Sequence, residues 1–225
     1  MKKIGMLVAV EMGAVLSRYG TARASERRHG FEVLTYDMDG YTLYVVHSGA
    51  GEIAAAAATQ LLIDRYEVGL VVNFGVVGGL TEEMAQTKTC VVERVVHYDF
   101  DTSAYDGTKP GQYSEYPDEF IPTTAALVER ATAIAPELKR VVCASADKFV
   151  DGPEAKGALH KRYGADICEM EAAAVTLTCN RSGVPCLLIK TVSDGLMGGA
   201  EDFGTALQHT SELCLEVADT IIREL

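Results

Sequence analysis

Seven apolar runs rich in β-branched residues recur along this chain, and they constrain its fold more than any other feature. Runs of this kind are typical of strands buried on both faces of a sheet. Helical segments separate several of them, most clearly the alanine-rich stretch from Glu52 to Ile63. The alternation predicts an α/β fold, with one domain over residues 1–225 and a mixed, largely parallel, twisted central sheet flanked by helices. The predicted strands cover residues 4–10, 41–47, 70–73, 89–96, 140–144, 166–170 and 185–192.

Three further stretches have a clear character. The pattern predicts helices over residues 124–134 and 202–224. Residues 102–122 are rich in Gly, Pro, Asp and Tyr and show no periodicity, so we expect an ordered loop or lid there.

The charge balance restricts the kind of partner. With 32 acidic and 20 basic side chains the net charge is −12, and Lys and Arg form no cluster. A nucleic-acid backbone and an anionic membrane surface would both repel such a chain, so we expect neither and favour a small-molecule ligand. No apolar run is long enough to cross a bilayer, and the N-terminal run is interpreted as a buried strand instead of a signal peptide. The six cysteines have no C-x-x-C pair and no zinc-ligand spacing, so we expect reduced thiols in a cytoplasmic protein.

Polar residues and glycines directly follow six of the predicted strands. In open α/β sheets ligands bind outside the carboxyl ends of the strands, so these residues predict a common ligand site. They are Glu11, Ser48-Gly49-Ala50-Gly51, Gly75-Val76-Val77-Gly78-Gly79, Ser145-Ala146-Asp147, Glu169-Met170-Glu171 and Ser193-Asp194.

Glu171 lies where a short apolar strand turns directly into an alanine-rich helix. The unpaired N–H groups and the dipole at a helix N-terminus favour a charged carboxylate, which accepts two hydrogen bonds from a vicinal diol. We therefore expect Glu171 to stay ionised and to bind a ribose. The alternative is that it only occupies the first turn of the helix.

Asp194 follows a strand too apolar to tolerate a charge within it, and Ser193 is placed to orient its carboxyl group. A carboxyl group facing an apolar pocket has its pKa raised by desolvation, which suits a general acid. The alternative is an ordinary Asp-Gly turn.

Two other motifs are weaker. The segment 49–54 matches the dinucleotide-binding pattern G-x-G-x-x-A, but the next strand ends in Asn73 and not in an acidic residue, so we do not expect a nicotinamide cofactor. His97, Asp99 and Asp101 share one strand face and could ligate a metal, yet a solvated strand end is the favoured interpretation.

Seven segments spread over nearly the whole chain belong to one pattern, and Glu-Met-Glu-Ala followed by a Ser-Asp pair is its most specific part. Together they resemble the nucleoside phosphorylase/nucleosidase superfamily, most closely its methylthioadenosine/S-adenosylhomocysteine nucleosidases. The resemblance implies a three-layer sandwich and a cytoplasmic homodimer that acts on a purine nucleoside in purine and methionine salvage without a cofactor or metal. The segments are residues 4–11, 48–51, 73–80, 97–101, 145–150, 169–172 and 192–194.

The resemblance also implies a role for individual residues. The Met170 backbone and Glu171 would hold the ribose hydroxyls, Phe149 would stack on the purine, and the Val150 backbone would read the edge of the base. The same likeness adds Ala50, Val76, Glu169 and Lys190 to the binding residues.

The leaving base and the 5′ end of the nucleoside would be held by other side chains. By the resemblance, Asp194 would protonate or hydrogen-bond N7 with Ser193 steering it, while Phe203 and a neighbouring subunit's Tyr105 would line the 5′ pocket. The chemistry agrees, because cleavage of an N-glycosidic bond leaves an oxocarbenium-like sugar and an anionic purine, and an acid at the base lowers the barrier.

The chain departs from the family pattern around the nucleophile. Gly13 occupies the position of the glutamate that activates water in hydrolytic members, Val76 replaces a serine, and Lys190 replaces an arginine. Glycine cannot act as a base, so Glu11, at the end of the first strand, is our candidate for the missing base. The opposing interpretation is that Glu11 is a surface residue.

Phosphorolysis is the alternative reaction, and it needs cations to hold phosphate. The arginines that phosphorylases use have no clear match, although Lys190, Arg18 and the Arg27-Arg28 pair could supply charge, and Glu52 would repel an anion. Hydrolysis is therefore favoured. A second alternative is a nucleoside-binding protein that keeps the base and ribose contacts but turns nothing over.

Overall fold

Ten strands form a single sheet in the computed structural model, which describes all residues from 1 to 225. The order of nine of them is β10-β6-β8-β9-β5-β1-β4-β3-β2, β10 also pairs with β5, and the tenth, β7, pairs with β6. Five pairings are parallel and five are antiparallel, so the sheet is mixed, as predicted. The strands are β1 (Lys2–Val8), β2 (Ala24–Arg28), β3 (Phe31–Asp37), β4 (Tyr41–His47), β5 (Leu70–Gly79), β6 (Thr89–His97), β7 (Ile121–Pro122), β8 (Lys139–Ser145), β9 (Ile167–Glu169) and β10 (Cys186–Asp194).

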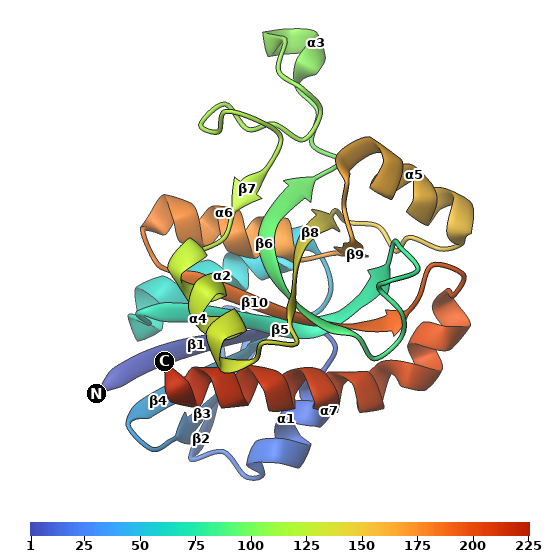
Figure 1. Cartoon of the computed structure of the whole chain (residues 1–225). Coiled ribbons are helices and arrows are strands. Elements are labelled where there is room, and N and C mark those ends of the chain that lie inside the picture. The colour runs from blue at the N-terminus through green and yellow to red at the C-terminus, as the bar shows by residue number, and fades with distance from the viewer.

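Helices cover both faces of this sheet, which gives three layers (Figure 1). Residues of α2 and α6 belong to the core cluster on one face, and residues of α1, α4 and α7 to the cluster on the other. Successive side chains of a strand point to opposite faces, so Leu7 of β1 packs in the first cluster while Met6 and Val8 pack in the second. The predicted three-layer α/β sandwich is thereby confirmed. The helices are α1 (Met12–Tyr19), α2 (Glu52–Tyr66), α3 (Ser103–Asp106), α4 (Ala125–Ile134), α5 (Pro153–Tyr163), α6 (Ala172–Ser182) and α7 (Ala200–Glu224).

The predicted loop between β6 and β7 is present and extends away from the body of the molecule, with the single-turn helix α3 at its tip (Figure 1). Tyr105 in α3 is 93% exposed. None of the helices combines the length and the apolar character needed to cross a bilayer.

Strand register brings the predicted site residues together. In the parallel pair β10–β5, Asp194 lies opposite Gly78, and a β-bulge between Val192 and Asp194 shifts the register there. The antiparallel pair β5–β9 places Gly78 opposite Cys168, next to Glu169. A bulge changes the direction in which the neighbouring side chains point. The bulge of β10 lies next to Asp194, where it turns the carboxylate of this residue toward the neighbouring strands.

Candidate active site

One pocket of about 570 Å3, including its open mouth, lies at the carboxyl ends of β1, β5 and β10, beside the end of β9. Glu171 and Asp194 both line it, so the two carboxylates on which the nucleoside prediction depended share one cavity. Most of the wall is apolar, which favours binding of a flat, weakly polar ring. Of the predicted site residues, Glu11, Ala50, Val76, Phe149, Val150, Glu169, Met170, Glu171, Asp194 and Phe203 line the pocket.

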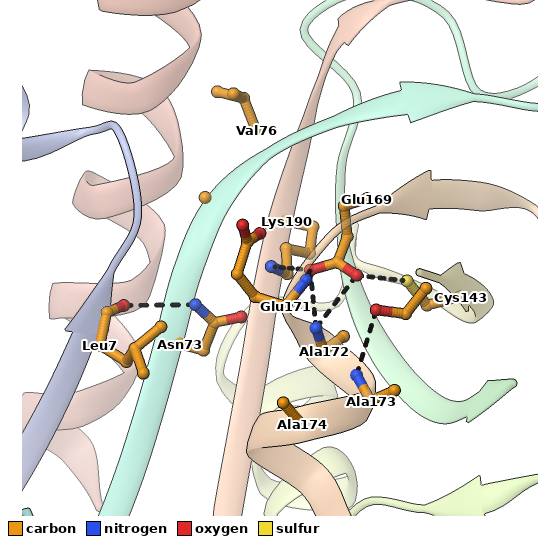
Figure 2. Close-up of polar contacts among 12 residues, drawn as sticks. Leu7, Asn73, Val76, Cys143, Glu169, Glu171, Ala172, Ala173, Ala174 and Lys190 are labelled. Carbon is orange, nitrogen blue, oxygen red and sulfur yellow. Dashed lines mark hydrogen bonds and ion pairs between the residues drawn. The ribbon is translucent and has the colours of Figure 1, made fainter. Parts of the chain in front are cut away.

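Glu169 caps helix α6. Its two carboxylate oxygens accept hydrogen bonds from the backbone N–H groups of Glu171 and Ala172 at 2.9–3.1 Å, as Figure 2 shows. Nζ of Lys190 donates to the same carboxylate at 3.0 Å, and both side chains are almost fully buried. Glu169 and Lys190 therefore form a structural ion pair behind the pocket. Burial opposes the charge on Lys190, but the carboxylates of Glu169 and Glu171 hold the pKa of Lys190 above its ordinary value.

The side chain of Glu171 makes no hydrogen bond to the helix that follows it. One of its oxygens accepts a hydrogen bond from the N–H of Gly51 at 2.8 Å, and its carboxylate points away from Ala172, to the side where Val76 lies (Figure 2). Burial, and next the charge of Glu169, raises the pKa of Glu171 to about 8. The prediction that the helix N-terminus keeps Glu171 ionised is thus wrong, because Glu169 takes the N–H groups that would have stabilised that charge.

Glu11 is buried and not a surface residue, since only 5% of it is exposed. Its carboxylate accepts hydrogen bonds from the N–H groups of Val10 and Val76, at 2.9 and 3.0 Å. A side chain at Gly75 would collide with Glu11, with a Cβ 2.7 Å from its Oε1. Gly75 therefore leaves the space in which the Glu11 carboxylate lies against β5.

Asp194 is held at both oxygens. Oγ of Ser193 donates to Oδ1 at 2.7 Å, as predicted, and Nζ of Lys156 donates to Oδ2 at 2.6 Å, which the sequence did not reveal. Burial raises the pKa of Asp194, and the hydrogen bonds from Lys156 and Ser193 oppose that rise.

Glu52 is a further buried carboxylate, which the sequence analysis considered only as a charge that would repel an anion. It lies 2.5 Å from Oγ of Ser145 and accepts the N–H of Ala174 at 2.6 Å. Burial, and next the charge of Glu169, raises the pKa of Glu52 to about 8. Its position directly after the Gly49–Gly51 turn was the available signal.

Two aromatic rings form part of the pocket wall. Phe149 and Phe203 contact each other edge to face, with ring centroids 5.5 Å apart and an interplanar angle of 78°. Phe149 is 41% exposed, which leaves ring surface for a ligand.

Comparison with known proteins places this geometry in a family. The family model described as "Phosphorylase superfamily" matches residues 4–223. The 5′-methylthioadenosine/S-adenosylhomocysteine nucleosidases of Shewanella sp. (strain W3-18-1) and Shewanella putrefaciens are both 34% identical over 200 residues, which is 85% of this chain and 85% of theirs. The chain belongs to the nucleosidases of the phosphorylase superfamily.

Solved structures of related nucleosidases agree with this assignment. The Helicobacter pylori 5′-methylthioadenosine/S-adenosylhomocysteine nucleosidase in complex with a pyrrolidine inhibitor superposes with a TM-score of 0.93 at 28% identity, covering 100% of this chain and 99% of that one. The futalosine hydrolase of the same organism gives 0.93 and 28%, covering 100% and 98%.

The remaining predicted residues lie outside the pocket of this nucleosidase. Ser193 and Lys190 are buried behind its wall, and Tyr105 is on the distant tip of α3. Nδ1 of His97 is hydrogen-bonded to the hydroxyl of Tyr113 at 2.8 Å. This contact favours a structural role for His97 over metal ligation. No group of three or more His, Cys, Asp or Glu side chains is arranged to hold a metal ion.

Proposed function

We propose that this chain hydrolyses the N-glycosidic bond of a purine nucleoside, with 5′-methylthioadenosine, S-adenosylhomocysteine or a related adenosine-like nucleoside as the substrate. The observation that carries the proposal is that the sugar side of the pocket has carboxyl groups and no unpaired buried cation. Glu11, Glu169 and Glu171 line it, and the buried cation beside them, Lys190, is already paired with Glu169. The other cation of the wall, Lys148, is exposed and adjoins Phe149. A phosphate nucleophile would therefore find no buried cation to hold it, whereas positive charge that develops on the sugar is stabilised by carboxylates.

In this mechanism the sugar is held by the turn between β9 and α6. Glu171 accepts hydrogen bonds from the ribose hydroxyls, and the backbone of Met170 contacts the same ring. Positive charge that develops on the sugar favours the ionised form of Glu171, so the interaction strengthens as the bond breaks.

The base lies on the opposite side of the pocket. Phe149 stacks on the purine and the backbone of Val150 reads its edge. Asp194, oriented by Ser193, delivers a proton to N7, so the purine does not leave as an anion.

Glu11 takes the place of the missing base at Gly13. Each of its oxygens accepts one backbone hydrogen bond, and a carboxylate oxygen has a further lone pair that can accept a proton from water. Glu11 then activates the water that attacks C1′. Replacing Glu11 with Gln, a neutral isostere, should lower kcat at least about 100-fold, and a wild-type rate would exclude it as the base.

The test is a product analysis. The protein is incubated with methylthioadenosine, adenosine and inosine, with and without phosphate, and the sugar product is identified. A free sugar formed without phosphate supports hydrolysis, and a sugar 1-phosphate supports the alternative, a purine nucleoside phosphorylase. Thermal stabilisation by the nucleoside without any product supports a nucleoside-binding protein, an outcome that the Val76 and Gly13 replacements would explain.

We further propose that the enzyme is a cytoplasmic homodimer of purine and methionine salvage, in which Tyr105 of one subunit closes the 5′ side of the other's pocket. The exposure of Tyr105 on an extended loop supports a contact with a second copy. Sedimentation tests the dimer. A higher KM in Tyr105→Ala with an unchanged dimer supports the placement of this side chain.

A further inference from the structure

A buried lysine lies directly behind Asp194, the proposed general acid of the pocket. Lys156, in α5, has no exposed surface, and its Nζ lies 2.6 Å from Oδ2 of Asp194. The same ammonium group donates to the backbone carbonyls of Asp194, Gly195 and Gly198, at 3.3, 2.8 and 2.9 Å. An ammonium group has three N–H donors, and four protein acceptors surround this one. No donor of Lys156 is left for a substrate, so any effect on the reaction has to pass through Asp194.

Strand β5 leaves the space in which this ion pair forms. A Cβ on Gly78 would lie 3.3 Å from Oδ2 of Asp194, 3.5 Å from Cε of Lys156 and 3.0 Å from the sulfur of Cys168. Contacts that close would force at least one of these groups to move. Glycine at this position therefore lets the ammonium and the carboxylate meet behind the pocket wall.

The other ionisable groups near the pair cannot replace the lysine as a source of protons. Burial raises the pKa of the Cys168 thiol to about 12, so it stays neutral but has no hydrogen bond to Asp194. Burial is the main cause that raises the pKa of Asp194, and Asp202, at the start of α7, adds to that rise. Ser193 orients the carboxyl group but is too weak an acid to supply a proton. Lys156 is the one cation in contact with Asp194.

A general acid has to regain a proton in every catalytic cycle, and this ion pair contains one. We propose that Lys156 is a positioning residue that also stores the proton, so that the Lys156–Asp194 pair as a unit, and not the aspartate alone, protonates the departing base. The inference rests on the proposed hydrolysis.

The proton transfers balance over one turnover. In the resting pair the proton is on Nζ of Lys156 and Asp194 is a carboxylate. As C1′–N9 breaks, its electron pair goes to the purine, Nζ passes a proton to Asp194, and the carboxyl group so formed passes one to N7, which leaves Lys156 as a neutral amine. The attacking water forms the new bond to C1′ and gives a proton to Glu11. When the products leave, Glu11 releases that proton to solvent and Lys156 takes one up, so the enzyme returns to its starting state.

The test compares the pH dependence of kcat for methylthioadenosine hydrolysis in the wild type, Lys156→Met and Lys161→Met. Lys161 is exposed on the same helix and provides the matched control. If the pair stores the proton, the wild-type kcat stays level up to about pH 9, because an ammonium group is a far weaker acid than a carboxyl group. In Lys156→Met the acid is a lone carboxyl group, so kcat falls about tenfold for each pH unit above its pKa and approaches the wild-type value near about pH 5. Lys161→Met should follow the wild type throughout.

Three outcomes overturn the inference. In the first, Lys156→Met is slowed by the same factor at every pH, as a purely structural role would require. In the second, it matches the wild type at pH 8. In the third, the wild-type kcat declines as the pH rises and the decline already begins below about pH 7, as for an isolated carboxyl group. This measurement needs no variant and decides the question even if Lys156→Met does not fold. A wild type that releases no sugar refutes the proposed hydrolysis itself and is distinct from all three.

Discussion

Replacing Glu52 with Gln is expected to stabilise the protein in alkaline solution and to leave its stability near pH 4 almost unchanged. Glu52 is only 7% exposed, and burial together with the charge of Glu169 raises its pKa from 4.5 to about 8. The unfolded chain loses this proton at its ordinary pKa, whereas the folded chain keeps it to about pH 8. The stability that protonated Glu52 preserves is therefore lost as the pH rises from about 4.5 to about 8.

The size of the effect follows from this interval. Each unit between the folded and unfolded pKa corresponds to about 1.36 kcal/mol, so the ionised carboxylate costs up to about 5 kcal/mol above pH 8. Glutamine removes that cost and still offers an oxygen to the N–H of Ala174 and a donor to Oγ of Ser145. Since Glu52 shares its surroundings with Glu169 and Glu171, we expect about 2–5 kcal/mol of stabilisation at pH 8.5.

Urea unfolding at pH 4.5 and pH 8.5 measures this difference. Glu154→Gln, at the exposed start of α5, is the control and should change the free energy of unfolding by less than about 0.5 kcal/mol at either pH. If Glu52→Gln is no more stable than the wild type at pH 8.5, or destabilises the protein equally at both values, Glu52 does not carry a buried charge and the reasoning fails.

Three further outcomes are expected. Because the pKa of Glu171 is about 8, the Kd of a non-hydrolysable nucleoside analogue should fall up to about 80-fold between pH 6 and pH 8.5, as the carboxylate becomes able to accept the ribose hydroxyls; calorimetry giving one Kd at both values would contradict this role. Gly79→Ala should cost at least about 3 kcal/mol in urea unfolding, because its Cβ would overlap the backbone carbonyl of Met84, and an unchanged midpoint would show that the chain relaxes there without cost. Lys190→Met should lose about 3–5 kcal/mol because it leaves the Glu169 charge buried and unpaired, and adding Glu169→Gln should restore part of that loss; a double variant as unstable as the single one would argue against the ion pair.

The fold was predictable where strands are buried on both faces. The sequences of β1, β5 and β10 are nearly continuous apolar runs, and such runs have few other uses in a protein of this size. The strand β2 was missed because it has the sequence ASERR, lies at the sheet edge and is mostly exposed. An edge strand without apolar alternation gives no periodic signal.

The location of the site at the strand ends was predictable from the sequence, but the contacts between its side chains were not. Asp194 and Glu171 follow apolar strands, so their shared location could be inferred from the general behaviour of α/β sheets. Lys156 could not be found in this way, because it belongs to a helix with a mostly polar sequence, and only the packing of α5 brings it to Asp194. The ionisation of Glu171 depends on which of two nearby glutamates accepts the first N–H groups of α6, and that choice is made by three-dimensional geometry.

The six cysteines are all reduced and buried, so their reactivity can be used to measure how often the structure opens. A thiol reagent can modify them only when the structure opens, so the rate of labelling measures the frequency of opening. Cys168 forms part of the pocket wall, whereas Cys214 belongs to α7 and packs in the core between that helix and the sheet. A nucleoside that fills the pocket should therefore slow modification of Cys168 more than that of Cys214, so the two sulfurs can separate local breathing at the mouth from opening of the whole molecule.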